Sequence, residues 1–181
     1  MGCFQCILKD EKKCPHRLQI EPILEAMDEA DMIIMASPNY VMGMTGQMKS
    51  FCDHLAYRFM SHRPNADMKK KIGIAISTTA GAGANKVTKA IKEQFFWWSV
   101  GKSYALPVIV SAFSLEEMKP EKKQKLTKQI KRLANQVNAN AFKVKPGLKT
   151  NMMFGIMRSM QSGMSYNPVD TMYWKEKGWI K

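Results

Sequence analysis

The residues with the most evident capacity for chemistry are cysteines near the start of the chain. Cys3 and Cys6 form a CxxC pair, and Cys14 and His16 follow soon afterwards. Three thiolates and an imidazole could close a tetrahedral zinc site, and three or four thiolates could hold an iron–sulfur cluster. A zinc site usually has a second closely spaced pair of ligands. A cubane cluster requires a fourth cysteine ligand, which this segment lacks. We therefore expect free thiols at Cys3, Cys6 and Cys14 rather than a bound metal.

A second candidate is the loop of residues 37–49, which reads S-P-N-Y-V-M-G-M-T-G-Q-M-K. Pro38 fixes one backbone angle, and Gly43 and Gly46 add conformational freedom. Thr45 can cap a following helix whose apolar residues recur at helical spacing, namely Met48, Phe51, Leu55 and Phe59. Cys52 lies mid-helix at a core-facing position, and we expect it to be a small buried hydrophobe. The pattern predicts a strand, a shaped loop and a helix.

A third candidate is the small-residue loop of residues 78–84, T-T-A-G-A-G-A. It follows the apolar run 72–77 and precedes a helical pattern with Val87, Ile91, Phe95 and Trp98. Such a loop lets a ligand approach the backbone closely and directs helix N-terminal amides toward it. Both loops occupy the carboxyl end of an expected strand, which is where open α/β sheets bind ligands.

The elements that must position these loops alternate between helices and strands. We predict strands at residues 31–36, 72–77 and 104–110, the first buried on both faces and the last at an edge because it contains Pro107. A helix with residues 18–30 precedes the first strand. The order indicates a layered α/β fold with right-handed crossovers and a parallel sheet.

The last third of the chain is helical by its periodicity. A long helix is expected to begin either at a Ser114/Glu117 capping box or at Pro120 and to end by Pro146. One apolar stripe marks it, made of Leu126, Ile130, Leu133, Val137, Ala141 and Val144. Met153, Ile156, Met157 and Met160 then recur at helical spacing, for which we expect core packing or a subunit contact. The aromatic end, residues 166–179, should pack onto the domain.

Composition narrows the class of protein. A chain of 181 residues with 45% apolar content matches one domain, and it contains neither a membrane-spanning run nor a signal peptide, so we expect a cytoplasmic protein. The net charge is +13, and residues 122–181 hold 13 of the 28 basic side chains but 2 of the 15 acidic ones. A solvated lysine face explains this bias, and without interleaved aromatic residues we expect neither nucleic acid nor membrane as partner.

Taken together, several motifs resemble one family. They are Gly2-Cys-Phe-Gln-Cys6 with Cys14, Ala30-Asp31, Ala36-Ser-Pro-Asn-Tyr40, Gly46-Gln-Met-Lys49 with Asp53, and Tyr173-Trp-Lys-Glu-Lys-Gly-Trp179. The chain resembles the flavodoxin-like NAD(P)H-dependent FMN reductases and their iron–sulfur flavoprotein relatives over nearly its whole length. The S-P-x-Y loop with the downstream G-x-x-K is the most specific part.

The resemblance implies an FMN site at the carboxyl ends of the strands. The positions expected along the isoalloxazine ring, with Tyr40 packed on it, are Ser37, Pro38, Asn39, Tyr40, Val41 and Met42. The positions expected at the flavin's polar edge and ribityl chain are Thr78, Thr79, Ala80 and Gly81. It also implies NAD(P)H as co-substrate and a small electron acceptor, without a catalytic side chain, because the cofactor carries the chemistry. We further expect a homo-oligomer, a dimer or tetramer.

Three departures from the family pattern bear on these expectations. The family's first strand, phosphate loop, helix and second strand have no counterpart before the cysteines, so we expect an N-terminally incomplete fold with a bare edge on the strand at residues 31–36. Lys9 stands where a third close cysteine would be expected, so an iron–sulfur cluster is not expected. His54 replaces a common arginine.

The sequence therefore predicts a flavodoxin-like doubly wound parallel sheet in three αβα layers, with a C-terminal helical extension. One domain spans 1–181, with a cysteine loop (1–17), an α/β core (18–145) and a helix and aromatic tail (146–181). The predicted function is an FMN-binding NAD(P)H-dependent oxidoreductase. The alternatives are a non-catalytic remnant or interaction module with a basic C-terminal surface, or an iron–sulfur flavoprotein electron carrier.

Overall fold

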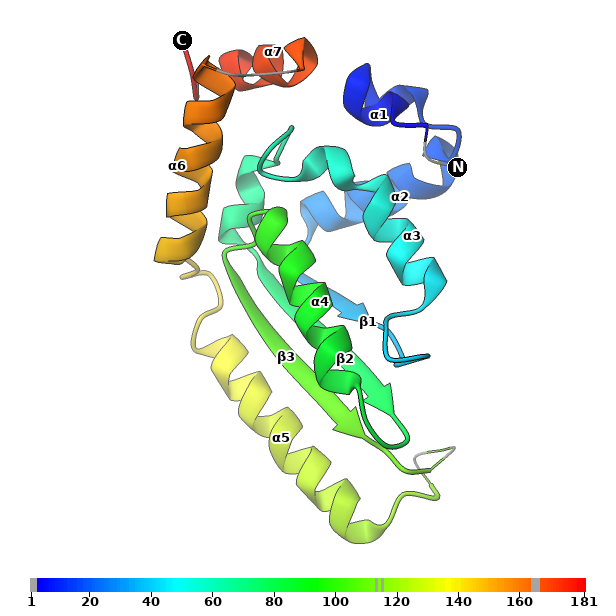
Figure 1. Cartoon of the computed structure of the whole chain (residues 1–181). Helices are drawn as coiled ribbons and strands as arrows, with labels where there is room; N and C mark the ends of the chain where they lie inside the picture. Colours follow the sequence, from blue (N-terminus) through cyan, green and yellow to red (C-terminus); the bar gives the residue numbers. More distant parts are fainter. Residues whose placement is uncertain (1–2, 113, 115, 164–166) are drawn as a thin grey trace.

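The chain alternates helices and strands over most of its length (Figure 1). The computed structural model describes residues 3–112, 114, 116–163 and 167–181. In order, its elements are α1 (Gln5–Leu8), η1 (Glu11–Lys13), α2 (Arg17–Glu29), β1 (Met32–Ala36), α3 (Gly46–His54), η2 (Ala56–Arg58), η3 (Ala66–Lys70), β2 (Ile72–Thr79), α4 (Ala84–Trp97), β3 (Lys102–Ile109), α5 (Pro120–Asn138), α6 (Leu148–Gly163) and α7 (Pro168–Glu176). No helix within this described part combines the length and the apolar character that crossing a bilayer requires.

The three strands form one parallel sheet in the order β1-β2-β3. Ile72 of β2 aligns with Met32 of β1 on one side and with Lys102 of β3 on the other. Helix α4 makes the crossover from β2 to β3 and lies over one face of the sheet (Figure 1). The expected α/β class and the edge position of Pro107 in β3 are therefore confirmed.

One apolar core joins α2, α3 and α4 to the sheet. The stripe predicted on α4 is buried as expected, and it comprises Val87, Ile91, Phe95 and Trp98. Gly73 of β2 lies under this helix, where an added Cβ would be 2.6 Å from the ring of Phe95. The close approach of α4 to the sheet thus depends on a glycine at this position.

The expectation that β1 is buried on both faces is wrong. Ile33 and Met35 are buried, whereas Met32 and Ile34 are 41% and 54% exposed. Helices α2 to α4 cover only the face that carries Ile33 and Met35, and on the opposite face α5 packs against β3, where the Tyr104 hydroxyl donates to the Gln136 carbonyl at 3.1 Å. Among the described residues no strand pairs with the outer edge of β1, as expected from the sequence.

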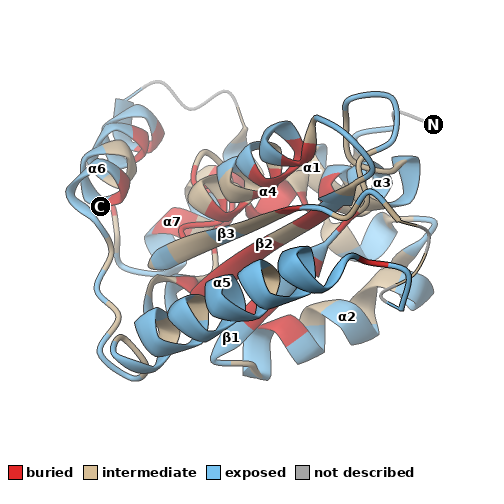
Figure 2. Cartoon of the chain, turned by 90° about the horizontal axis from the view of Figure 1, so that it is seen from below, coloured by how far each residue is buried: buried red, intermediate tan, exposed pale blue. Residues whose placement is uncertain are grey.

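Helix α5 begins with Pro120 in its first turn, so the proline alternative for its start is correct. It ends at Asn138, earlier than the predicted end near Pro146, because residues 139–147 form turns and an irregular segment. None of its residues is buried, as the pale blue and tan colours of α5 in Figure 2 show. Ile130 is among the exposed apolar side chains. The predicted stripe is only partly covered because the helix packs along the edge strand β3.

A second apolar cluster gathers the C-terminal elements around Trp174, which is fully buried. Met60, Met157 and Ile180 are its other buried members, and Phe154 stacks on Trp174 with a centroid distance of 5.0 Å. Core packing is thus confirmed for Met157, and the aromatic tail packs onto the rest of the chain. Tyr166, the first residue of the predicted aromatic tail, lies outside the described residues.

A buried ion pair connects this C-terminal region to the start of the chain. The carboxylate of Asp170 accepts from the guanidinium of Arg63, and the side chains of these two residues are 1% and 5% exposed. Asp170 also contacts His62 Nδ1 at 2.7 Å and accepts from Asn167 Nδ2 at 2.9 Å. Arg63 donates further to the backbone carbonyls of Cys6 and Ile7. The pair therefore holds α7, the segment between η2 and η3, and the cysteine segment together.

Cys52 occupies the core as predicted, and this yields a test of thiol reactivity. It is 2% exposed, and burial raises the pKa of its thiol to about 11. Because the thiolate is the reactive species, we expect an alkylating reagent near pH ~8 to spare Cys52 in the folded protein and to modify the exposed Cys3. Peptide mass spectrometry before and after guanidinium denaturation measures this. Equal labelling of Cys52 in both states would contradict its burial.

Candidate cofactor site

The two loops predicted to bind a ligand lie side by side at the carboxyl end of the sheet. The loop after β1 continues the pairing with β2, because the Ser37 amide donates to the Ile76 carbonyl at 3.1 Å and the Asn39 amide to the Thr78 carbonyl at 2.9 Å. This contact follows from the parallel order of β1 and β2, which brings both carboxyl ends to the same edge.

Asn39 fastens the first loop to the second. Its Nδ2 donates to the Ala82 carbonyl at 2.8 Å and lies 3.4 Å from Thr79 Oγ1. The Thr79 hydroxyl donates to the same carbonyl at 2.8 Å. Gly83 has φ of 103°, and a Cβ there would lie 2.4 Å from Asn39 Nδ2. Only glycine combines that backbone angle with space for the asparagine.

Ser37 anchors the other end of the first loop. Its buried Oγ accepts from the Thr45 amide at 3.0 Å and donates to the Pro38 carbonyl at 3.1 Å. The Thr45 side chain in turn accepts from the Met48 amide at 3.2 Å, which confirms it as the N-cap of α3. This helix ends at His54, and the predicted apolar pattern continues through η2. The loop is thus held at its base and along its flank.

The tip of the first loop is a tight turn that presents apolar side chains outward. Tyr40 and Gly43 exchange two backbone hydrogen bonds of 3.0 Å, and Val41 and Met42 between them have φ of 49° and 62°. Positive φ at both central residues is the geometry of a type I′ turn, which is costly for a β-branched residue. Tyr40 is 65% exposed and Val41 101% exposed. A strained apolar tip on a fixed base is typical of a ligand-binding loop.

The chemistry of the two loops suits an uncharged, hydrogen-bonding group. Residues 36–46 and 77–85 contain no basic side chain. The Oδ1 atom of Asn39 is buried without a hydrogen-bond partner and offers an acceptor to an N–H or O–H group of a ligand. The ring system of a flavin combines a flat apolar surface with such a polar edge, so the residues present fit the ring side of FMN.

Comparison with known proteins agrees with this geometry. The family model for NADPH-dependent FMN reductase matches residues 3–112, which include both loops. The chain belongs to this family. An iron–sulfur flavoprotein of Archaeoglobus fulgidus is 28% identical over 99% of this chain and 78% of its own length. An iron–sulfur flavoprotein of Methanocaldococcus jannaschii is 34% identical over 49% of this chain and 42% of its own length.

Family membership establishes a flavodoxin-like α/β fold and a flavin-dependent oxidoreductase class for the chain. Among the positions named from the sequence, the fold of this FMN reductase family member brings together Ser37, Asn39, Thr78 and Thr79 at one edge of the sheet. It places Val41 and Met42 on the exposed tip, with Tyr40 beside them.

One residue at this edge was missed by sequence reasoning. Ser111, two positions after β3, donates from its hydroxyl to the Ala80 carbonyl at 2.8 Å and so fixes the second loop from the far side. A polar residue just beyond the carboxyl end of the third strand was the available signal, because all parallel strands end at this edge.

The cysteine segment does not fit the cluster that the relatives' names imply. A cubane is held by four thiolates, whereas only Cys3, Cys6 and Cys14 lie in this segment and Cys52 is buried in the core. Within the described part of the chain, the group of potential metal ligands that converge includes Cys14 but neither Cys3 nor Cys6. Burial, and secondarily the neighbouring Cys14, raises the pKa of the Cys6 thiol.

Proposed function

We propose that this chain is an FMN-dependent oxidoreductase that takes electrons from NAD(P)H and passes them to a small-molecule acceptor. The observation that carries the proposal is the joining of two consecutive strand-end loops, through Asn39, into one uncharged surface beside the exposed ring of Tyr40. The family model matches both loops, which supports FMN as the group that this surface binds.

The residues of the two loops would contact different parts of the flavin. Those proposed along the ring are Ser37, Pro38, Asn39, Tyr40, Val41 and Met42. Those proposed at its polar edge and ribityl chain are Thr78, Thr79, Ala80 and Gly81. Bound FMN would supply hydride acceptance from a nicotinamide, so the protein needs to orient the ring and exclude water rather than provide an acid or base. Asn39 offers the orienting acceptor and Tyr40 the apolar cover.

The setting of the reaction is part of the same proposal. We propose that the reaction takes place in the cytoplasm and that the active form of the protein is a homo-oligomer. The exposed apolar tip at Tyr40, Val41 and Met42 supports an oligomer, since a second subunit packed on it would exclude water from the ring. Size-exclusion chromatography with light scattering measures the oligomeric state directly.

Flavin titration tests the proposed function. Tag-free protein is titrated with FMN while the flavin fluorescence is followed, and the loaded protein is then assayed for oxidation of NADH and NADPH with quinone and nitro-compound acceptors. We expect saturable quenching and oxidation of a nicotinamide. A protein that leaves FMN fluorescence unchanged would overturn the proposal for this chain and favour the interaction-module alternative.

Tyr40→Ala tests the contact between the loop and the ring. Loss of aromatic stacking, worth about 0.5–1.5 kcal/mol, should weaken FMN binding roughly 2-fold to 10-fold and slow nicotinamide oxidation. Tyr40→Phe keeps the ring and should bind FMN nearly as the parent does. Identical titration curves for Tyr40→Ala and the parent would show that the loop does not touch the flavin.

A further inference from the structure

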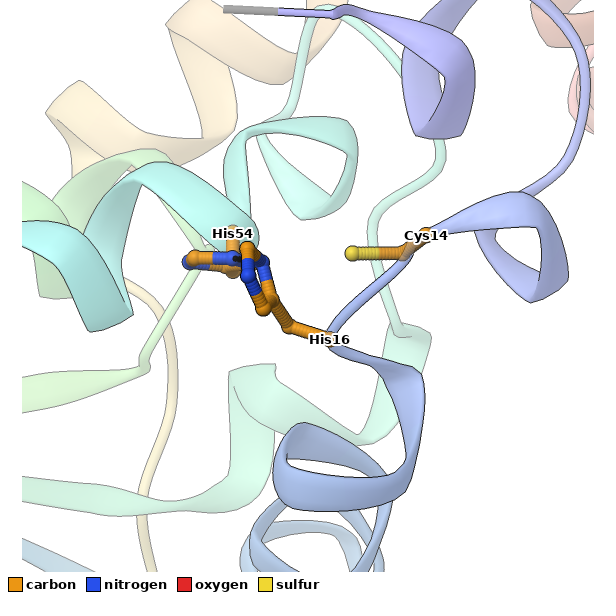
Figure 3. A group of neighbouring side chains, drawn as sticks. All are labelled: Cys14, His16 and His54. Atoms are coloured by element: carbon orange, nitrogen blue, oxygen red, sulfur yellow. Dashed lines mark hydrogen bonds between the residues drawn. The ribbon is translucent and has the colours of Figure 1, made fainter. Parts of the chain in front are cut away.

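Three potential metal ligands from two separate segments converge beside the cysteine loop. Cys14 precedes α2, His16 is the residue before its first turn, and His54 is the last residue of α3. Their ligand atoms all lie within 4.8 Å of one another. Figure 3 shows the thiol of Cys14 pointing toward the two imidazoles. This grouping differs from a cysteine-based site, because it uses two histidines and leaves out Cys3 and Cys6.

The orientation of His54 is fixed in the way that metal-binding histidines usually are. Its Nδ1 lies 2.6 Å from the carbonyl oxygen of Ser50, which can only accept, so Nδ1 carries the hydrogen. The lone pair is therefore on Nε2, which faces His16 Nδ1 at 2.7 Å. A backbone carbonyl behind the ring is a common partner of a ligating histidine and holds the correct tautomer.

The dimensions are close to those of a zinc site. With Zn–N distances of about 2.0–2.1 Å and tetrahedral angles, two ligating nitrogens lie about 3.4 Å apart. The two ring nitrogens are 2.7 Å apart, so opening by about 0.7 Å admits the ion. His16 is exposed, which permits a rotation of this size. A pocket of about 50 Å³ borders Cys14 and His54, which is enough space for a water molecule as fourth ligand.

The surrounding charges do not oppose a cation. Arg17 is paired with Glu21 at 2.8 Å, and Lys49 is paired with Asp53 across one turn of α3. The basic side chains of α2 and α3 are thus offset by carboxylates. Lys12 also lines the pocket, together with the carboxylates of Glu11 and Glu21, and metal binding would add the charge of the Cys14 thiolate. A thiolate with two imidazoles suits Zn²⁺ better than hard cations such as Mg²⁺ or Ca²⁺.

We propose that Cys14, His16 and His54 bind one divalent transition-metal ion, with Zn²⁺ as the physiological candidate. The ion would join the segment before α2 to the end of α3. This link would add to the contacts that Arg63 makes with the carbonyls of Cys6 and Ile7, in a segment where neither α1 nor η1 contributes a buried residue. The proposal is independent of flavin binding, since the site lies at the opposite end of α3 from the loop that begins at Ser37.

Cobalt substitution tests the site by its spectrum. Tag-free, chelator-treated and reduced protein is titrated with Co²⁺ under anaerobic conditions, and the thiolate-to-cobalt and d–d absorption bands are recorded. We expect one equivalent bound with a tetrahedral spectrum, displaced by Zn²⁺. A parent protein without these bands, or with a stoichiometry far from one, would overturn the proposal.

Matched variants separate this site from a cysteine-only site. His16→Ala with His54→Ala, and separately Cys14→Ser, should weaken Co²⁺ binding by at least about 100-fold, with the thiolate band lost in Cys14→Ser. Cys3→Ser with Cys6→Ser should retain both bands. Cobalt absorption bands that persist in the double histidine variant, or that disappear in the Cys3/Cys6 variant, would contradict the assignment. Zn²⁺ should also raise the midpoint of thermal unfolding of the parent protein but not that of Cys14→Ser. This comparison tests metal binding in a variant that differs by one side chain.

Discussion

Asp170→Ala should strongly destabilise the folded protein. The substitution removes the buried carboxylate that hydrogen-bonds the guanidinium of Arg63, whose side chain is 5% exposed. It leaves Arg63 only the half-exposed carboxylate of Glu11, which lies 3.5 Å from Arg63 Nε. Breaking a buried pair in this way costs about 3–5 kcal/mol in the free energy of unfolding. The loss should also free the carbonyls of Cys6 and Ile7, because Arg63 no longer has a fixed position.

Urea unfolding followed by circular dichroism measures the effect of Asp170→Ala. Asp67→Ala is the matched control, since Asp67 pairs with Lys70 at 2.8 Å but both side chains are largely exposed. That variant should unfold almost as the parent does. Asp170→Asn keeps the shape and some hydrogen bonds and should fall between the two. Equal midpoints for Asp170→Ala and Asp67→Ala would show that the ion pair is not structural.

Local signals predicted local structure well in this chain. The Thr45 cap and the start of α5 at Pro120 each depend on backbone chemistry within one turn, and the structure confirms both. The apolar stripe of α4 needed only its periodicity, because a helix between two parallel strands must cover the sheet. These elements place the two loops at the carboxyl edge, which is the part of the candidate site that sequence could predict.

Whether an apolar side chain is buried depends on segments that are distant in sequence, so burial was predicted less well than secondary structure. The apolar run of β1 does not reveal that Ile34 faces away from α2, α3 and α4. The stripe of α5 likewise does not reveal that only an edge strand lies beneath it. An apolar residue shows that burial is favourable, but the cover comes from other segments.

The contacts that shape the candidate sites were hidden for a similar reason. His16 and His54 are 38 positions apart, and only the packing of α2 beside α3 brings their rings to a centroid distance of 4.8 Å. Asn39 reaches Ala82 across 43 positions. A histidine or an asparagine in a sequence does not indicate which distant residue it contacts. The sequence therefore predicted the two loops but not the hydrogen bonds between them.

Gly83→Ala should separate the two loops and therefore test the central contact of the proposed flavin site. The new Cβ would lie 2.4 Å from Asn39 Nδ2, so Asn39 must move and its bond to the Ala82 carbonyl is lost. Alanine at positive φ adds about 1–2 kcal/mol of backbone strain. We expect FMN binding to weaken by more than ~10-fold, since one hydrogen bond and the shape of the surface are lost together.

Gly46→Ala provides the control, because nothing lies within 4 Å of its added Cβ and it begins α3 beside the first loop. It should leave both the FMN titration and the urea midpoint nearly unchanged. The clash itself is isolated by a double-mutant cycle with Asn39→Ala. Once the asparagine is removed, Gly83→Ala should cost only its backbone strain, and FMN binding should fall little further. Strictly additive losses across the cycle would mean that the Asn39 side chain does not join the loops in solution. The backbone hydrogen bonds of Ser37 and Asn39 to β2 would then hold the first loop in place.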